Sequence, residues 1–242
     1  AAANAIQADL AGRPTASVLF ASAKSQIDFL RMLQRDRSID WSRVDAYHVD
    51  EYVGIDGNHP ASFRRFLLEH LLNQVKFNAF HGIRGEAADP AAECERYSAL
   101  LSAAKPGLAI LGIGENGHLA FMDPGVCDFN DPQSMRVVEM DDQCRQQQVH
   151  DGAFARAADV PRTALSVTIP LLMSIPKLLV VVPGSRKAEA VRSALEGPVT
   201  PDCPASVLRR HPNATLYLDA DAASLLSPRL EEPEAVGAGT EN

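Results

Sequence analysis

One stretch of the chain, residues 108–125, combines residue types that could do chemistry. It reads LAILGIGENGHLAFMDPG, an apolar run that breaks into a glycine-rich turn and then presents one histidine. This pattern is typical of a buried parallel strand that leads into a functional loop. Gly114 and Gly117 permit tight turning and a close backbone approach to a ligand, and free N–H groups in such a loop can hold an anion. His118 then follows the strand at its carboxyl end, where open α/β sheets bind ligands.

Two polar residues near this histidine could assist it. Asn116 precedes His118, and Asp123 follows five residues later. A carboxylate at that distance could orient the imidazole ring and set its tautomer. A lone histidine is more often structural than catalytic, but the strand and the glycines before His118 favour a catalytic role.

A pair of acids, Asp50 and Glu51, follows a second predicted strand, residues 41–49. One interpretation is a general base held at a ligand crevice, with Glu51 among the substrate-binding residues. The other is a pair of solvated loop acids, and the pattern alone leaves both open.

Basic and hydroxyl side chains follow two further predicted strands. The segment GSRK, which ends at Lys187, offers backbone donors at a helix N-terminus and a cation, as a phosphate site would; an ordinary basic first turn fits equally well. The loop after residue 20 carries Ser22, Lys24 and Ser25 as donors. Arg145 is a further cation that could reach an anionic ligand, although its ordinary role would be solvation.

Alternating strand and helix patterns must position these residues. Predicted strands cover residues 17–20, 41–49, 108–111, 135–140, 164–169, 178–182 and 215–218, with helices between most of them. This alternation predicts an α/β fold, a single domain over residues 1–227 with a mostly parallel sheet and helices on both faces. The acidic, Gly/Ala-rich residues 228–242 are predicted to be disordered.

Bulk properties exclude several classes. The chain has 242 residues, 46% of them hydrophobic, and a formal charge of −8, which argues against a nucleic-acid or membrane-surface binder. Four scattered cysteines without a Cys-x-x-Cys pair argue against a disulfide framework or a zinc site and favour the cytoplasm. No long apolar run or signal-peptide pattern is present. No dinucleotide or Walker motif fits its required context.

The stretches LGIGENGHLAF and HVDEYVGIDGNHPASFRRFL together resemble the family of glucosamine-6-phosphate deaminases and 6-phosphogluconolactonases, over residues 17–219. The resemblance implies a Rossmann-like fold, a sugar-phosphate substrate, no cofactor, and a chain that could form homo-oligomers. It implies that Asp50 is the general base and that His118 opens the sugar ring. Asn116 and Asp123 match positions beside that histidine, and Lys187 matches a phosphate-binding lysine.

Several positions depart from the deaminase pattern. The loop SAKSQ, residues 22–26, lacks the usual glycines and proline, and Met122 replaces a usual Asn. The phosphate-binding arginine of deaminases falls at His150, unless Arg145 substitutes for it. The segment PRTALSVTIPLL is closer to the lactonase pattern.

Three functions remain open from the sequence. The favoured one is deamination and aldose–ketose isomerisation of an amino-sugar 6-phosphate. The second is a lactonase in which His118 activates water; Tyr52 and Leu119 stand where lactonases have other residues and favour the deaminase. The third is a non-catalytic sugar-phosphate sensor, suggested by the altered loop.

Overall fold

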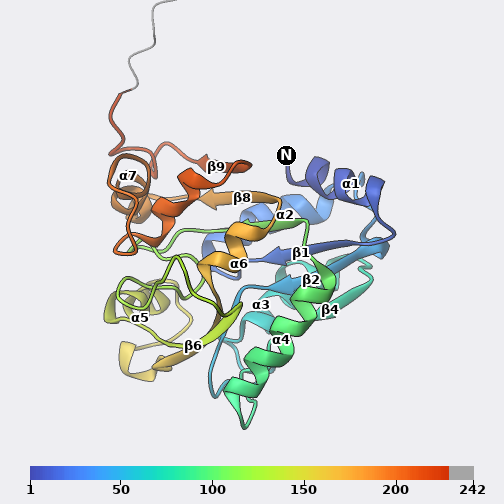
Figure 1. The fold of residues 1–242 in the computed structure, drawn as a ribbon, viewed down its shortest axis with the longest axis horizontal. Coiled ribbons are helices and arrows are strands. Elements are labelled where there is room, and N and C mark those ends of the chain that lie inside the picture. The colour runs from blue at the N-terminus through green and yellow to red at the C-terminus, as the bar shows by residue number, and fades with distance from the viewer. Residues whose placement is uncertain (229–242) are drawn as a thin grey trace, which may run out of the picture.

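The computed structural model describes residues 1–228 and contains a six-stranded parallel sheet (Figure 1). Its strand order is β4-β2-β1-β5-β8-β9, and every neighbouring pair is parallel. The mostly parallel α/β fold predicted from the sequence is therefore confirmed. The strands are β1 (Ala16–Phe20), β2 (Val44–His48), β4 (Ala79–His81), β5 (Leu108–Leu111), β8 (Lys177–Val182) and β9 (Ala214–Leu218).

Helices cover both faces of this sheet. Along β1, Val18 and Phe20 pack in one apolar cluster, while Leu19 between them packs in another, because successive strand residues point to opposite faces. The first cluster includes buried residues of α1, α2 and α3, and the second includes residues of α4, α6 and α7. The helices are α1 (Ala2–Gly12), α2 (Ile27–Arg35), α3 (Phe63–His70), α4 (Pro90–Ala104), α5 (Asp142–His150), α6 (Ile169–Ser174) and α7 (Ala188–Glu196).

Local sequence signals explain where two helices begin. The hydroxyl of Ser62 accepts a hydrogen bond from the backbone N–H of Arg65 and caps α3. Asp89 caps α4 through the N–H groups of its first turn, with Pro90 at the first helical position. Short 3-10 helices occupy η1 (Lys24–Gln26), η2 (Trp41–Arg43), η3 (Leu72–Gln74), η4 (Ala157–Asp159), η5 (Ser185–Lys187) and η6 (Pro204–Arg210).

A second sheet corrects the predicted strand layout. It is antiparallel, in the order β3-β7-β6, and consists of β3 (Asp50–Tyr52), β7 (Thr163–Val167) and β6 (Met135–Glu139). The sequence predicted one strand over residues 41–49, followed by a loop at the two acids. Instead, Val49 joins two sheets: its N–H donates to Phe20 in the parallel sheet, and its carbonyl accepts from Val167 in the antiparallel one.

Two further points concern the C-terminal tail and membrane-spanning helices. The tail predicted to be disordered after Pro228 lies outside the described residues. Within the described residues, no helix combines the length and apolar character needed to cross a membrane.

The strand order predicts where a ligand should bind. From β1 the chain proceeds to β2 and β4 on one side of the sheet, and β5, β8 and β9 lie on the other side. The order therefore reverses between β1 and β5, and open α/β sheets bind ligands outside the carboxyl ends of strands at such a point.

Candidate active site

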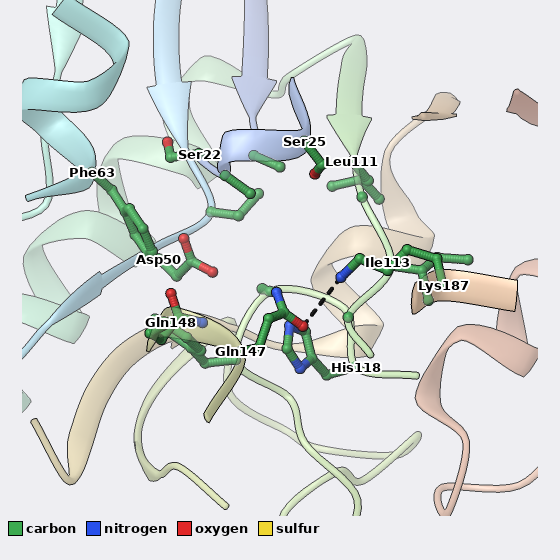
Figure 2. Close-up of a pocket in the computed structure, with 17 residues that line it drawn as sticks. Ser22, Ser25, Asp50, Phe63, Leu111, Ile113, His118, Gln147, Gln148 and Lys187 are labelled. Carbon is green, nitrogen blue, oxygen red and sulfur yellow. Dashed lines mark hydrogen bonds between the residues drawn. The ribbon is translucent and has the colours of Figure 1, made fainter. Parts of the chain in front are cut away.

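A cavity lies at the carboxyl ends of β1 and β5 and receives side chains from loops of both sheets (Figure 2). The loop after β1, the start of β3, the loop after β5, helix α5 and η5 all contribute to its walls. The cavity thus brings together half of the residues predicted from the sequence, which come from segments far apart in the chain: Ser22, Ser25, Asp50, Gly114, His118 and Lys187.

The loop after β5 fits closely around His118. The Gly114 N–H donates to the His118 carbonyl at 3.0 Å and closes the turn. A Cβ at Gly114 would lie 2.3 Å from atoms of the imidazole ring, so only glycine leaves room for the ring in this position. Gly117 has a φ of +87°, in the region that favours glycine. Gly117 forms part of the turn but does not line the cavity.

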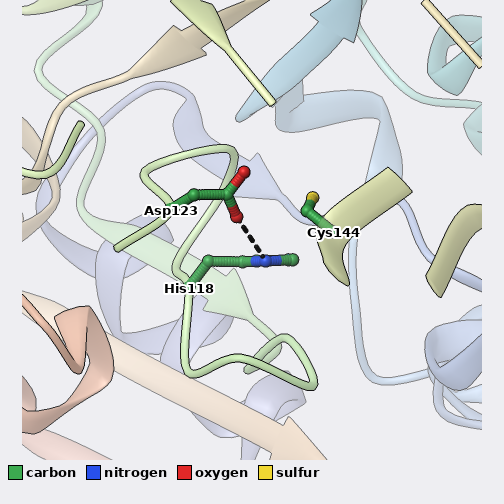
Figure 3. Close-up of side chains that lie close together, drawn as sticks. All are labelled: His118, Asp123 and Cys144. Carbon is green, nitrogen blue, oxygen red and sulfur yellow. Dashed lines mark ion pairs between the residues drawn. The ribbon is translucent and has the colours of Figure 1, made fainter. Parts of the chain in front are cut away.

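Asp123 and Asn116 support His118 from outside the cavity. Asp123 Oδ1 lies 2.9 Å from His118 Nδ1, and Asp123 is fully buried. Figure 3 shows the ring edge-on with the carboxylate to one side of it, so the two atoms lie close together but do not form an in-line hydrogen bond. Asn116 accepts from the His118 N–H at 3.1 Å and donates to Asp123 Oδ1 at 3.0 Å. The two residues therefore hold both the backbone and the ring of His118.

Electrostatics keep Asp123 ionised. Burial opposes its charge, but the contact with His118 and the hydrogen bonds from Asn116 and from the Asp141 N–H outweigh burial and lower the pKa of Asp123. A buried, ionised Asp123 therefore lies beside the His118 ring.

Asp50 presents a buried carboxylate to the cavity. It is 6% exposed, and its Oδ1 has no hydrogen-bond partner among the described residues. Burial, followed by the charges of Glu51 and Asp123, raises the pKa of Asp50 well above its ordinary value. The ionised form is therefore an unusually strong base for a carboxylate.

Lys187 supplies a buried cation at another wall of the cavity. Its Nζ donates to Gln147 Oε1 at 3.1 Å, and the residue is 8% exposed. Burial lowers the pKa of Lys187, while the charges of Asp151 and Glu115 oppose that shift. An anionic group that entered the cavity would gain a desolvated ion pair with this ammonium group.

Glu51, predicted as a substrate-binding residue, lies away from the cavity. Its carboxylate accepts from the Ser62 hydroxyl at 2.8 Å and from the N–H groups of Tyr52, Phe63 and Arg64 at 3.1 Å each. These contacts cap α3. Burial, partly offset by the hydrogen bonds, raises the pKa of Glu51. This placement favours a structural role.

Lys24 and Arg145 also lie outside this cavity. Lys24 lines two neighbouring cavities, one of which shares Ser25 and Lys187 with the site. Arg145 pairs with Asp142 at 3.2 Å and donates to the Ala157 carbonyl, so it ties α5 to η4. Arg145 therefore does not replace the arginine that the resemblance led us to look for.

The structure also places two other departures from the deaminase pattern, His150 and Met122. His150 Nδ1 lies 3.2 Å from Glu115, and Arg186 Nε lies 3.0 Å from the same carboxylate. Arg186 also approaches Asp151 at 3.6 Å. Met122 is fully buried in the core and does not line the cavity.

Sequence reasoning missed two cavity residues on α5, Gln147 and Gln148. Gln147 Oε1 accepts from both Lys187 Nζ and the Glu115 N–H, which links α5 to the loop after β5. Gln148 Oε1 accepts from the Tyr52 hydroxyl at 2.6 Å. The only available signal was the run of three glutamines after the Asp141 cap, and a polar helix of this kind is usually exposed.

The fold and the cavity define an α/β protein whose ligand site combines a buried carboxylate, a supported imidazole and a buried ammonium group. The model of the family of glucosamine-6-phosphate isomerases and 6-phosphogluconolactonases matches residues 1–217. The chain therefore belongs to this family, as its motifs predicted.

Individual relatives agree with this assignment. The chain is 39% identical over 207 residues to a glucosamine-6-phosphate deaminase of Exiguobacterium sibiricum, covering 86% of this chain and 80% of the relative. It is 38% identical to one of Bacillus cereus, covering 82% and 74%. A solved monomeric glucosamine-6-phosphate deaminase superposes with a TM-score of 0.81 at 29% identity, covering 92% and 94%. The 6-phosphogluconolactonase of Trypanosoma brucei shares the fold, with a TM-score of 0.77 at 16% identity and coverage of 93% and 91%.

Proposed function

We propose that this chain converts glucosamine 6-phosphate and water into fructose 6-phosphate and ammonia. The observation that carries the proposal is the convergence of Asp50, His118 and Lys187 on one cavity, where a base, a proton carrier and an anion-binding cation are all present. The named function of the relatives at 38–39% identity supports the same reaction.

His118 opens the sugar ring in this proposal. A pyranose opens when the C1 hydroxyl loses a proton and the ring oxygen gains one, so a single group can carry the proton between them. An imidazole is suited to this task at neutral pH. Asp123 stabilises the imidazolium that forms in between, and Asn116 fixes the loop that presents the ring.

Asp50 then moves a proton from C2 to C1. Removal of the C2 proton leaves an enol-type intermediate, and return of the proton to C1 gives an imine at C2. Water adds to the imine carbon and ammonia leaves, so the sugar becomes a ketose and all atoms balance. The unpartnered Oδ1 of Asp50 is free to make this contact, and its raised basicity assists removal of a carbon-bound proton.

The phosphate binds at the Lys187 wall in this proposal. The Ser25 hydroxyl lines the same cavity and can donate to phosphate oxygens. Because Gln147 accepts a hydrogen bond from Lys187, the ammonium group is held in place before the substrate arrives.

The first experiment measures ammonia release from glucosamine 6-phosphate, galactosamine 6-phosphate and glucosamine. We expect release from glucosamine 6-phosphate alone. No release from any of the three would overturn the proposal, and binding without turnover would instead indicate a sugar-phosphate sensor. Hydrolysis of 6-phosphogluconolactone is measured in parallel, and a faster rate on the lactone would assign the chain to the lactonase branch of the family.

A further inference from the structure

His118 and Asp123 have a third neighbour, Cys144 on α5, which the proposed reaction does not use (Figure 3). One donor atom from each of these residues lies within 4.8 Å of the other two. All three side chains are buried, with Cys144 1% exposed and Asp123 fully buried. Within the described residues this is a compact group of one imidazole, one carboxylate and one thiol.

These donors match the ligands of zinc and related cations. Zinc in proteins binds cysteine sulfur, histidine nitrogen and carboxylate oxygen, and three protein ligands leave a fourth position for water or a ligand. In a tetrahedral site with bonds of that kind, the donor atoms lie about 3.5 Å apart. The three donor atoms therefore need to move about 1 Å closer together to bind one ion.

Two buried atoms in the same region lack directed partners among the described residues. His118 Nδ1 makes no in-line hydrogen bond, and neither does Asp50 Oδ1, whose residue is 6% exposed. Figure 2 shows the Asp50 carboxylate and the His118 ring extending into the same cavity. His118 therefore connects the group to the cavity, whereas Asp123 and Cys144 do not line it.

The local charge also favours a cation. Asp141 lies beside the same group: its N–H donates to Asp123 Oδ2 at 3.0 Å, and its Oδ1 accepts from the Cys144 N–H at 2.6 Å. A divalent ion would offset this negative charge, which the buried setting leaves poorly screened by water.

We propose that His118, Asp123 and Cys144 form an inhibitory site for a thiophilic divalent cation, with zinc as the physiological ion. Binding forms one bond from the metal to each side chain, and the thiol proton is released to solvent. The ion takes a nitrogen lone pair of His118 and holds its ring, so the ring can no longer carry a proton. Inhibition of ammonia release rests on the proposed function, whereas metal binding does not.

Cobalt is the probe, because a cobalt–thiolate bond produces a near-ultraviolet charge-transfer band and tetrahedral cobalt absorbs strongly in the visible. Titration of the full chain with Co²⁺ should give both bands with one ion bound per chain, and Zn²⁺ should displace the cobalt. Cys144→Ser should lose the charge-transfer band and bind Zn²⁺ more weakly by at least about tenfold. Cys127→Ser, which alters a half-buried cysteine outside the cluster, should behave as the parent does.

The same variants separate the site from the reaction. With the parent chain, one equivalent of Zn²⁺ should abolish ammonia release and a chelator should restore it. Cys144→Ser should keep the basal rate and resist Zn²⁺. Asp123→Asn should retain the thiolate band with weaker affinity, which tests the cluster if the cysteine variant fails to fold. Absence of a charge-transfer band in the parent, or an unchanged band in Cys144→Ser, would overturn the site even if the chain proves to be a deaminase.

Discussion

Asp50 and His118 line one cavity but come from different sheets: Asp50 begins a strand of the antiparallel sheet, whereas His118 lies in a loop that follows a parallel strand. Val49 joins the two sheets through hydrogen bonds to both, so the position of Asp50 is fixed by the junction itself. Asp50 is therefore held by a sheet junction and His118 by a hydrogen-bonded turn, and small losses of geometry should be costly for the proposed reaction.

Replacement of Asp50 by Asn should abolish the reaction but not substrate binding. The amide has nearly the same shape as the carboxylate but cannot accept the C2 proton. Exchange of the C2 hydrogen with solvent should fall by at least about 10²-fold, the usual contribution of a general base. Proton exchange is followed by NMR and binding by calorimetry. An exchange rate equal to that of the parent would show that Asp50 is not the base.

The same replacement should stabilise the protein at neutral pH. The pKa of Asp50 is raised in the folded state above its ordinary value of 3.8, so between these two pKa values the folded chain holds a proton that the unfolded chain has lost. Its contribution to stability therefore falls as the pH rises from about 3.8 through the raised pKa. Asp50→Asn lacks this penalty and should gain about 1–3 kcal/mol at neutral pH, with no gain in acid below the unfolded pKa.

Chemical denaturation at several pH values measures this difference. Asp28→Asn, at a side chain that is 93% exposed, is the control and should change stability little. A gain in Asp50→Asn that did not depend on pH would point to packing as its cause and would contradict the linkage argument.

The sequence carried the information for most of the elements, because each depends on local patterns. The apolar runs at residues 108–111 and 178–182 predicted β5 and β8. The second sheet was not predictable in this way. Asp50 pairs with Ser166, and nothing in the local pattern of either segment identifies the strand with which it pairs.

One difference between the predicted and the observed site follows from that missing sheet. In a strand, neighbouring residues point to opposite faces, so Asp50 can face the cavity only if Glu51 faces the other way. The sequence predicted both acids at the end of one strand, with Asp50 as the base and Glu51 as a substrate-binding residue. Gln147 and Gln148 were missed for a different reason: amides are polar, and only the tertiary fold shows that these two are 5% and 6% exposed.

Glu51 should be required for stability rather than for substrate contact. Glu51→Ala leaves the Ser62 hydroxyl and the N–H groups at the start of α3 without their acceptor. The expected loss is about 2–4 kcal/mol in the free energy of unfolding. Glu86→Ala is a matched control, because Glu86 contacts the same Arg64 but is half exposed, and it should cost less than about 1 kcal/mol. A variant with parental stability and a raised KM would instead favour a substrate-binding Glu51.

Lys187 should be required for recognition of the phosphate group of the substrate. Lys187→Met keeps the length and the apolar stem but removes the charge, so KM for glucosamine 6-phosphate should rise about 10- to 100-fold, the value of one charge-assisted hydrogen bond. Any weak turnover of unphosphorylated glucosamine should be unchanged. Lys24→Met is the control, since Lys24 lies in the neighbouring cavities, and its effect should be smaller. Equal effects of the two variants would place the phosphate between the cavities.

Gly114→Ala should reduce activity without unfolding the chain. The new methyl group would lie 2.3 Å from the His118 ring, and the ring can rotate away at little cost because it is the end of a side chain. The ring would then leave the position held by Asp123, and a displacement of that size costs about 10²-fold in kcat. Steady-state kinetics and thermal unfolding measure the two effects, and Gly12→Ala, where a Cβ meets nothing within 4 Å, is the control. Parental kcat in Gly114→Ala would show that the observed orientation of His118 is not needed for turnover. Recovery of a reduced kcat after the loop is enlarged at another position would confirm that Gly114 keeps the ring in its observed position.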